Sequence, residues 1–415
     1  MRTVSTGHDE RGTMTATRGL VIVGAGFAGF WAAAAARRFA GSELPIRLVA
    51  PEPSLVIRPR LYEAHPETLA VDLRPLLATL DVGFITASAV ALDRDTVVLS
   101  TGERVAYDRL VVATGSVMQR PSFAGVELTF TVDSQSEAVA FDRRLLEIAT
   151  EASADKARTP CIAVIGAGFT GIELALELRD RIAAHTTSSI VPDVAQRLRI
   201  VLVDRADVVG VELGEGPRPL IEEALNEARV ELRLGSGVSS LDERLHELVD
   251  GERVQVDAVV LATGLVASSF VSEVPGERDH AGRILVDRYL RAPDAGHIFL
   301  AGDTGAADVG DGHRTLASCQ HALQLGRVAG ENAARDLQGR PLVPYEQLRY
   351  VTCLDLGRSG AVLTSGWDRA VVQAGPDTKR LKVRINTEII YPPIDGSLEE
   401  LLRQSELDPE ARTAS

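Results

Sequence analysis

Two short apolar runs, each followed by the same glycine spacing and then by a helical pattern, are the clearest feature of this chain. The runs and their glycines are residues 20–23 (LVIV) with Gly24, Gly26 and Gly29, and residues 161–165 (CIAVI) with Gly166, Gly168 and Gly171. A buried strand, a G-x-G-x-x-G loop and a helix form the phosphate-binding unit of a Rossmann-type fold. One such pattern is weak evidence, but two copies predict an α/β chain with two dinucleotide-binding units.

Three later apolar runs end in small or acidic residues, where a doubly wound sheet holds its ligands. The residues at these ends are Ala113, Thr114 and Gly115, then Thr263 and Gly264, then Gly302 and Asp303. A glycine lets the chain pass close to a cofactor, and an aspartate accepts hydrogen bonds from sugar-like hydroxyls. The order of these signals predicts FAD in the first unit and NADH in the second. Other expected cofactor contacts are Phe27, Ala28, Arg60, Val90, Phe169, Thr170 and Ala322.

The acid expected after the second strand of each unit is present only once. Residues 46–50 end in Ala50, so Glu52 is the candidate replacement, and a solvated loop glutamate is an equally good interpretation. Residues 198–203 lead directly into Asp204. An acid there favours the 2′-hydroxyl of NADH over the phosphate of NADPH. The adjacent Arg205 leaves NADPH open.

Motif order predicts the domains. Residues 18–155 and 276–342 are expected to form a discontinuous FAD-binding domain, and residues 156–275 an NAD(P)H-binding domain. Residues 343–415 read as a small C-terminal α+β domain, and residues 1–17 as a disordered leader. The predicted fold class is therefore α/β, with two Rossmann-like domains and a small C-terminal domain.

Composition excludes several classes of function. The net charge of −14 over 415 residues leaves no basic surface for nucleic acid. The three cysteines have no zinc or C-x-x-C spacing, and none lies between residues 20 and 159, so we expect no metal site and no thiol–disulfide chemistry. This cysteine usage favours a reducing compartment, and we expect a cytoplasmic protein.

The chain also resembles a known family, the type II NADH dehydrogenases, or NADH:quinone oxidoreductases. Residues 319–324 (CQHALQ) are similar to the family's Ala-Gln-x-Ala-x-Gln quinone motif, with cysteine in place of the first alanine. Residues 58–63 (RPRLYE) and 385–393 (INTEIIYPP) also resemble family stretches. The resemblance implies an FAD-dependent oxidoreductase that transfers hydride from NADH to FAD. Two electrons then pass to a quinone or quinone-like acceptor.

Three residues are the candidates for catalysis. Gln320 and Gln324 are four apart and share one helix face, so their amides can donate to a quinone carbonyl; ordinary packing glutamines are the alternative. Glu173 lies in the first turn of the second unit's helix. The resemblance implies that it lies near the nicotinamide and the flavin and positions the hydride donor or handles a proton. A capping or solvated glutamate is the alternative.

The last residues of the chain differ from membrane-bound members of that family. The residues after Pro393 include six acids, only two arginines and one short stripe of leucines. A membrane-surface helix needs a basic polar face and a large apolar face, so we expect contact with the inner face of the membrane to be peripheral at most. A soluble tailoring flavoenzyme for a natural-product intermediate and a reductase of an electron-carrier protein remain alternatives. A non-enzymatic NADH-responsive binding protein is a third. The acceptor's identity and a homodimeric state stay open.

Overall fold

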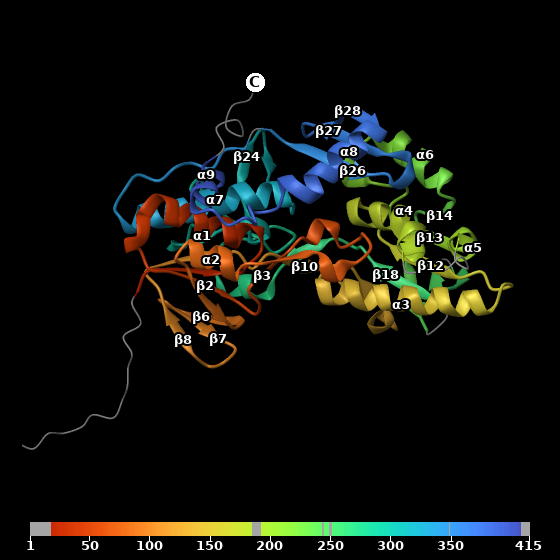
Figure 1. Cartoon of the computed structure of the whole chain (residues 1–415), viewed down its shortest axis with the longest axis horizontal. Coiled ribbons are helices and arrows are strands. Elements are labelled where there is room, and N and C mark those ends of the chain that lie inside the picture. Colours follow the sequence, from red (N-terminus) through yellow and green to blue (C-terminus); the bar gives the residue numbers. More distant parts are fainter. Residues whose placement is uncertain (1–17, 185–191, 243–244, 249–250, 348, 408–415) are drawn as a thin grey trace, which may run out of the picture.

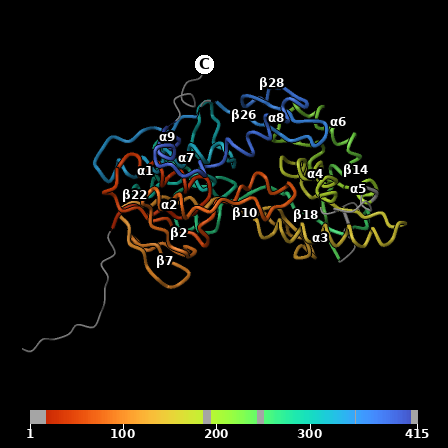
Figure 2. Tube along the Cα trace, viewed as in Figure 1, coloured from red at the N-terminus to blue at the C-terminus, as the bar shows by residue number. Residues whose placement is uncertain are grey.

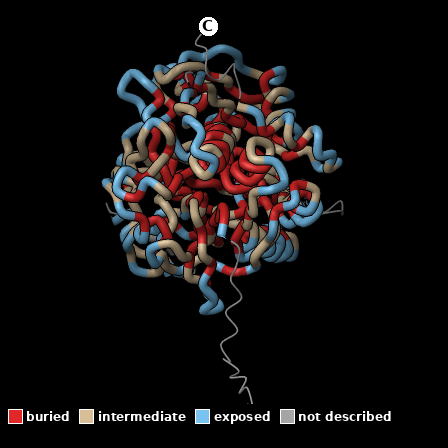
Figure 3. Tube along the Cα trace, turned by 90° about the vertical axis from the view of Figure 1, so that its left-hand side faces the viewer, coloured by how far each residue is buried: buried red, intermediate tan, exposed pale blue. Residues whose placement is uncertain are grey.

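The computed structural model describes residues 18–407 except 185–191, 243–244, 249–250 and 348. Two parallel sheets lie side by side along the long axis of the molecule, and a small antiparallel sheet covers part of the second (Figure 1). Buried positions gather at the centre of the molecule when it is viewed end on, and exposed positions lie around them (Figure 3). The predicted leader, residues 1–17, lies outside the described residues.

The first glycine motif lies at the centre of a six-stranded sheet. In spatial order the strands are β21 (Arg291–Ala292), β22 (Ala295–Leu300), β9 (Arg109–Val112), β1 (Leu20–Val23), β2 (Ile46–Ala50) and β5 (Gly83–Thr86). Every pair except β21 with β22 is parallel. Because both faces of a parallel sheet are covered, all four residues of β1 are buried. This explains why the strand reads as a continuous apolar run.

Side chains of β1 alternate between two different covers. Leu20 and Ile22 join the core formed with α1 (Phe27–Ala40) and α7 (Cys319–Leu337), and Val21 and Val23 join a separate core on the other face. That second face is covered by a three-stranded antiparallel sheet. Its strands are β6 (Ala89–Asp93), β7 (Thr96–Leu99) and β8 (Arg104–Ala106).

Helices α1 and α7 are distant in sequence and lie side by side in space (Figure 2). Two glycines of α7 make this approach possible. A Cβ atom at Gly326 would overlap the carbonyl oxygen of Ala28, and one at Gly330 would overlap that of Ala32. The helix that carries the predicted quinone motif is therefore packed backbone to backbone against the helix that follows the first glycine loop.

The second glycine motif lies at the centre of a five-stranded parallel sheet. Its strands are β11 (Phe130–Thr131), β18 (Ala258–Leu261), β12 (Cys161–Ile165), β13 (Arg199–Val203) and β14 (Val230–Arg233). The helices of this unit are α3 (Gln135–Ala154), α4 (Phe169–Ala184), α5 (Pro192–Arg197) and α6 (Arg218–Glu227).

This arrangement differs from the boundary predicted at residue 156. Strand β11 pairs with β18, and the buried side chains of α3, such as Phe141 and Leu145, share one core with Ile162 of β12. The second unit thus begins near residue 130. Sequence pattern alone assigned α3 to the first unit because α3 precedes the second glycine motif.

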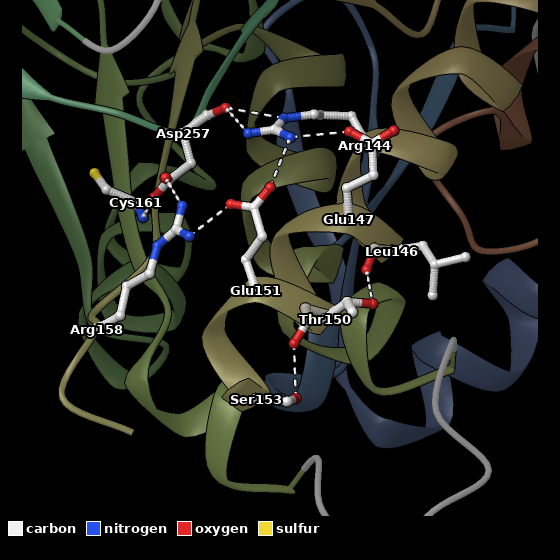
Figure 4. Close-up of polar contacts among 10 residues, drawn as sticks. Arg144, Leu146, Glu147, Thr150, Glu151, Ser153, Arg158, Cys161 and Asp257 are labelled. Atoms are coloured by element: carbon white, nitrogen blue, oxygen red, sulfur yellow. Dashed lines mark hydrogen bonds and ion pairs between the residues drawn. The ribbon is translucent and has the colours of Figure 1, made fainter. Parts of the chain in front are cut away.

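Polar contacts fix the end of α3 to the start of β12 (Figure 4). The Asp257 carboxylate accepts from the Cys161 N–H at 2.8 Å and from Arg158, and its carbonyl accepts from Arg144 at 3.2 Å. Glu151 binds both arginines. Their close packing around Asp257 shows that residues 144–161 form part of the scaffold of the second unit.

The remainder of the chain connects the two units. Strands β10 (Ser116–Met118) and β19 (Leu265–Ala267) pair antiparallel between them. The C-terminal elements are β26 (Val351–Asp355), β27 (Ala361–Ser365), β28 (Ala370–Gly375), α8 (Pro376–Arg384), a π-helical turn (Ile385–Ile389) and α9 (Leu398–Gln404). Leu354 of β26 joins the core of the second unit, whereas Leu401 of α9 joins the core of the first. The C-terminal segment therefore spans both units.

The other elements are short. They are β3 (Ser54–Val56), β4 (Ala70–Asp72), α2 (Arg74–Thr79), β15 (Val238–Leu241), β16 (Leu245–Leu248), β17 (Arg253–Gln255), β20 (Ile284–Leu285), β23 (Gly305–Ala306), β24 (Asp308–Gly310) and β25 (His313–Arg314). Within the described part of the chain, none of the helices combines the length and the apolar character needed to cross a membrane.

Candidate functional site

The first glycine loop is closely packed behind and open in front. A Cβ atom at Gly24 would overlap the carbonyl oxygen of Ala113, and one at Gly29 would overlap that of Gly24. A Cβ atom at Gly26 would meet nothing within 4 Å. The α1 N-terminus beside Gly26 has no side-chain cap, so its N–H groups face this open space. The loop has the form of a cradle for a phosphate group.

The Gly-Asp strand end lies against the same loop. Gly302 has a φ of 67°, and a Cβ atom there would be 3.0 Å from the Ala28 Cβ and 3.7 Å from the Ala322 Cβ. The next residue, Asp303, accepts from the Ser116 hydroxyl at 2.6 Å. Loss of solvent raises the pKa of the Asp303 carboxyl, and the hydrogen bond from Ser116 opposes this rise. The first loop, the Gly-Asp turn and α7 thus converge at one place.

Helix α7 begins at Cys319. The hydroxyl of Ser318 caps the helix by accepting from the His321 N–H at 3.2 Å. The Thr315 hydroxyl accepts instead from the Ala307 N–H at 3.1 Å, which holds Thr315 in the preceding loop. The cap therefore defines the turn on which the predicted quinone motif begins.

The two glutamines of that motif have unpaired amide atoms. Gln324 is buried, and neither its Oε1 nor its Nε2 has a hydrogen-bond partner among the residues that the structure describes. The Oε1 of Gln320 is also buried without a partner. Buried polar atoms are nearly always hydrogen-bonded, so two such side chains on one helix face are unusual. Ala322, two residues from each glutamine, lies on a different side of α7, and that side meets Gly302.

His321 lies on a different face of α7 from the two glutamines. Its ring stacks on Tyr350 with 5.1 Å between ring centroids, Tyr350 stacks on Trp367 at 4.6 Å, and Trp367 stacks on His313 at 4.5 Å. Burial lowers the pKa of His321 to about 4. A neutral, stacked imidazole at neutral pH fits a packing role and not that of a general acid.

Glu173 of α4 forms a buried ion pair that the sequence did not indicate. Its Oε1 accepts from the Lys382 ammonium at 2.8 Å and from the Asp355 N–H at 2.9 Å. Burial raises the pKa of Glu173 to about 7, against the opposing effect of Lys382. Burial would lower the pKa of Lys382, but the charge of Glu173 raises it above its ordinary value. The pair therefore combines a protonated amine with a carboxyl that titrates near neutrality.

This ion pair lies where the three parts of the chain meet. The Lys382 nitrogen lies 5.4 Å from the ring centroid of Phe169 in the second glycine loop and 5.9 Å from that of Tyr62 in the first unit. The Tyr62 hydroxyl donates to Asp355 at 3.2 Å, and Lys379 binds the same carboxylate at 2.6 Å. Lys382 and Lys379 follow Glu173 by some two hundred residues, so no local pattern identified them.

The second glycine loop repeats the geometry of the first. A Cβ atom at Gly166 would overlap the carbonyl oxygen of Ala262, and one at Gly171 would overlap that of Gly166. Asp204 directly follows β13, as predicted, and its carboxylate accepts from the Ala167 N–H at 2.6 Å. The Asp204 carboxylate is thus held against the second glycine loop.

Several predicted cofactor contacts have other partners in the structure. Arg60 binds Glu63 at 2.7 Å and the Tyr391 hydroxyl at 2.9 Å. Val90 is exposed on β6, and Glu52 is exposed in the turn after β2. Arg60, Val90 and Glu52 stay predictions as cofactor contacts.

The two threonines at strand ends bind the connecting strands. The Thr114 hydroxyl lies 2.5 Å from that of Ser268, and the Thr263 hydroxyl donates to the Gln119 carbonyl at 2.5 Å. Any contact of these residues with a cofactor would therefore come from the backbone, as it would for Gly115 and Gly264. Phe27 is packed in the core of the first unit, whereas Thr170 is exposed.

Arg58 is a candidate that sequence reasoning missed. It donates to the Ser116 hydroxyl at 3.0 Å and binds Asp133, and Ser116 in turn donates to Asp303. Its position in the RPRLYE stretch was noted, but the pattern favoured Arg60. Arg58 is therefore the first member of a series of hydrogen bonds that passes through Ser116 and ends at Asp303 in the Gly-Asp turn.

The three cysteine thiols are weakly acidic in this structure. Burial raises the pKa of Cys161 and of Cys353 to about 11 and also raises that of Cys319, so all three thiols are poorly ionised at neutral pH. All three are free. Among the residues that the structure describes, no group of three or more histidine, cysteine, aspartate or glutamate side chains could hold a metal ion. The residues present fit two dinucleotides, FAD and a nicotinamide dinucleotide.

Comparison with known proteins agrees with this geometry. The model of the pyridine nucleotide-disulphide oxidoreductase family matches residues 18–326. The chain is 40% identical over 394 residues to an NADH dehydrogenase-like protein of Mycobacterium tuberculosis, covering 92% of this chain and 96% of that protein. It is 26% identical over 390 residues to a type II NADH:quinone oxidoreductase of Staphylococcus aureus, covering 90% and 95%.

A solved structure shows the same fold. The sulfide:quinone oxidoreductase of Aquifex aeolicus superimposes with a TM-score of 0.72 at 18% identity, over 92% of each chain. The two glycine loops, the family match and the NADH dehydrogenase-like relatives lead to one conclusion. This chain belongs to the pyridine nucleotide-disulphide oxidoreductase family and is an NAD(P)H-dependent oxidoreductase related to the NADH dehydrogenase-like proteins.

Proposed function

We propose that this enzyme takes electrons from NADH and delivers them to a quinone or quinone-like acceptor. The observation that carries the proposal is the set of buried amide atoms of Gln320 and Gln324, which share one face of α7 and have no hydrogen-bond partner among the described residues. Neutral amides can hydrogen-bond a quinone carbonyl without adding charge. Two relatives support the same acceptor class, a demethylphylloquinone reductase of Synechocystis at 25% identity and the staphylococcal quinone oxidoreductase.

In the reaction the protein binds the cofactors, orients the acceptor and holds a proton. When bound, FAD accepts electrons from NADH two at a time and passes them on. The N–H groups of the α1 N-terminus beside Gly26 would hold the pyrophosphate, and Asp303 would accept hydrogen bonds from a sugar-like hydroxyl chain. Gln320 and Gln324 orient the acceptor through its carbonyl oxygen. Glu173, with a pKa of about 7, holds a proton close to the second loop.

We propose NADH as the preferred donor. Asp204 lies at the end of β13 with its carboxylate against the second loop, and a carboxylate there repels the 2′-phosphate of NADPH. Replacement of Asp204 by asparagine should therefore raise the relative activity with NADPH. Comparison of kcat/KM for the two donors in wild type and variant measures this preference.

Rapid kinetics on the anaerobic, FAD-loaded protein tests the function. NADH should bleach the flavin absorbance, and a soluble ubiquinone or menaquinone analogue should restore it. Gln320→Ala should slow the recovery about 10- to 100-fold, since a lost hydrogen bond to a group that gains charge is worth roughly 1.5–3 kcal/mol, and should leave the bleaching unchanged. Gln338→Ala is the matched control, because Gln338 lies at the exposed other end of α7.

The outcomes separate the acceptor classes. Fast bleaching without recovery by quinones would remove the quinone assignment and leave a dedicated substrate or a protein acceptor. Equal recovery rates in Gln320→Ala and wild type would show that α7 does not bind the acceptor. We further propose a cytoplasmic location with peripheral membrane contact at most, supported by the net charge of −14, and cell fractionation tests it.

A further inference from the structure

The two glycine loops differ at one position, although their backbones match. At Gly26 in the first loop, a Cβ atom would meet nothing within 4 Å. At Gly168 in the second loop, a Cβ atom would overlap the Oε1 of Glu212 and lie 3.3 Å from its Cδ. The space beside Gly26 in the first loop is therefore open, whereas the equivalent space beside Gly168 in the second loop holds the Glu212 carboxylate.

The Glu212 carboxylate also takes the hydrogen bond that a phosphate would take. Its Oε1 accepts from the Phe169 N–H, the first residue of α4, at 2.8 Å. A carboxylate and a phosphate oxygen favour the same place at a helix N-terminus, because both bind its unpaired N–H groups and the positive end of its dipole. At the corresponding end of α1, no side chain caps the helix.

The backbone around Glu212 is held against the second glycine loop, whereas the side chain of Glu212 is exposed. Glu212 lies in a single 3-10 turn between Gly210, with a φ of 60°, and Gly214, with a φ of 77°. The Gly210 N–H donates to the Ala167 carbonyl of the loop at 2.8 Å, and Leu213 is buried. The Glu212 side chain itself is exposed, so rotation about its side-chain bonds can move the carboxylate into solvent.

We propose that Glu212 is a built-in competitor for the nicotinamide dinucleotide. Its carboxylate takes the place of the pyrophosphate at the second loop and rotates into solvent when the dinucleotide binds. The two negative groups cannot share the Phe169 N–H, so binding includes the loss of the Glu212 cap. The same contact, made again as the dinucleotide leaves, favours release of NAD⁺. The inference rests on the proposed function only in that the second loop binds a nicotinamide dinucleotide.

The test measures binding of ADP-ribose, which carries the pyrophosphate but no nicotinamide and so cannot react. Calorimetry on the FAD-loaded protein compares wild type with Glu212→Gln and Glu212→Ala. We expect ADP-ribose to bind Glu212→Ala about two- to thirtyfold more tightly, the range that loss of a competing helix cap implies. Glu212→Gln should lie between, because it keeps an acceptor for the Phe169 N–H and loses the charge. Adenosine, which has no phosphate, should bind all three alike.

Glu215→Gln is the matched control. Glu215 is exposed three residues further along the same loop, so its replacement changes the net charge equally without touching the Phe169 N–H. Unchanged ADP-ribose affinity in Glu212→Ala would overturn the proposal. Weaker affinity would also overturn it and would make Glu212 a group that accepts from a ribose hydroxyl. Absence of ADP-ribose binding in every variant would remove the nicotinamide site as well, whereas failure to reduce quinones would leave this binding test intact.

Discussion

Replacement of Glu173 by glutamine should change the pH dependence of stability by a calculable amount. The Glu173 carboxyl is 3% exposed, and burial raises its pKa from the ordinary 4.5 to about 7. The folded protein therefore binds this proton more tightly than the unfolded chain does. The contribution to stability is whole below pH 4.5 and is lost as the pH rises through 7. At roughly 1.4 kcal/mol per pKa unit, the loss comes to about 3 kcal/mol.

The assay is urea unfolding of wild type and Glu173→Gln between pH 5 and pH 8.5, followed by tryptophan fluorescence. Glutamine has the shape of the protonated carboxyl and does not ionise. We expect a variant that is more stable than wild type by only about 1 kcal/mol at pH 5 and by about 3 kcal/mol at pH 8.5. Glu147→Gln, a change on the exposed surface of α3, should leave the pH dependence unaltered.

One result would refute this reasoning. If Glu173→Gln is less stable than wild type at pH 8.5, and the gap widens between pH 5 and pH 8.5, attraction to Lys382 outweighs burial. The pKa of Glu173 would then lie below its ordinary value, and the site would hold a permanent ion pair. Lys382→Met checks the other partner, because an uncompensated buried carboxylate should cost on the order of 3–5 kcal/mol at pH 8.5 and less at pH 5.

Three further predictions concern packing and chemistry. Gly330→Ala should push α7 away from the Ala32 carbonyl, lower stability by about 1–3 kcal/mol and weaken FAD retention, as thermal unfolding and flavin absorbance after gel filtration would show; unchanged retention would contradict the close α1–α7 contact. His321→Phe should leave the pH profile of NADH oxidation unchanged between pH 5.5 and 9, because the pKa of His321 is about 4; loss of an acidic limb would refute the packing role. Serine in place of all three cysteines should preserve NADH oxidation, and a large fall in kcat would assign one thiol a catalytic part.

The features predictable from sequence were those whose physical cause is local. A tight turn against a strand end requires Gly24 or Gly166 within a few residues of that strand, so the spacing itself encodes the loop. The acid at Asp204 and the shared face of Gln320 and Gln324 follow from strand and helix periodicity in the same way. These patterns predicted the fold and the position of both loops.

The features that escaped prediction depend on contacts between distant segments. Lys382 reaches Glu173 only because the C-terminal segment crosses the second unit, and Arg58 reaches Asp303 only through Ser116. In the sequence Glu212 looks like an ordinary surface glutamate, because only the folded chain brings its 3-10 turn against the second glycine loop. Helix α3 was assigned to the wrong unit because strand pairing, not chain order, decides where it packs.

The arrangement of the first sheet has a consequence for how the protein is made. Its strand β9 pairs with β22 and its helix α1 packs against α7, so the first contact cannot form before residue 300 has left the ribosome and the second is complete only after residue 337 has done so. The second sheet uses only residues between 130 and 261 and can close earlier during synthesis. Until α7 has been synthesised, the apolar faces of α1 stay uncovered. Long loops must close to bury these faces, which slows folding. The unit at the start of the chain is therefore completed after the second unit, and FAD can bind fully only once α7 has been made.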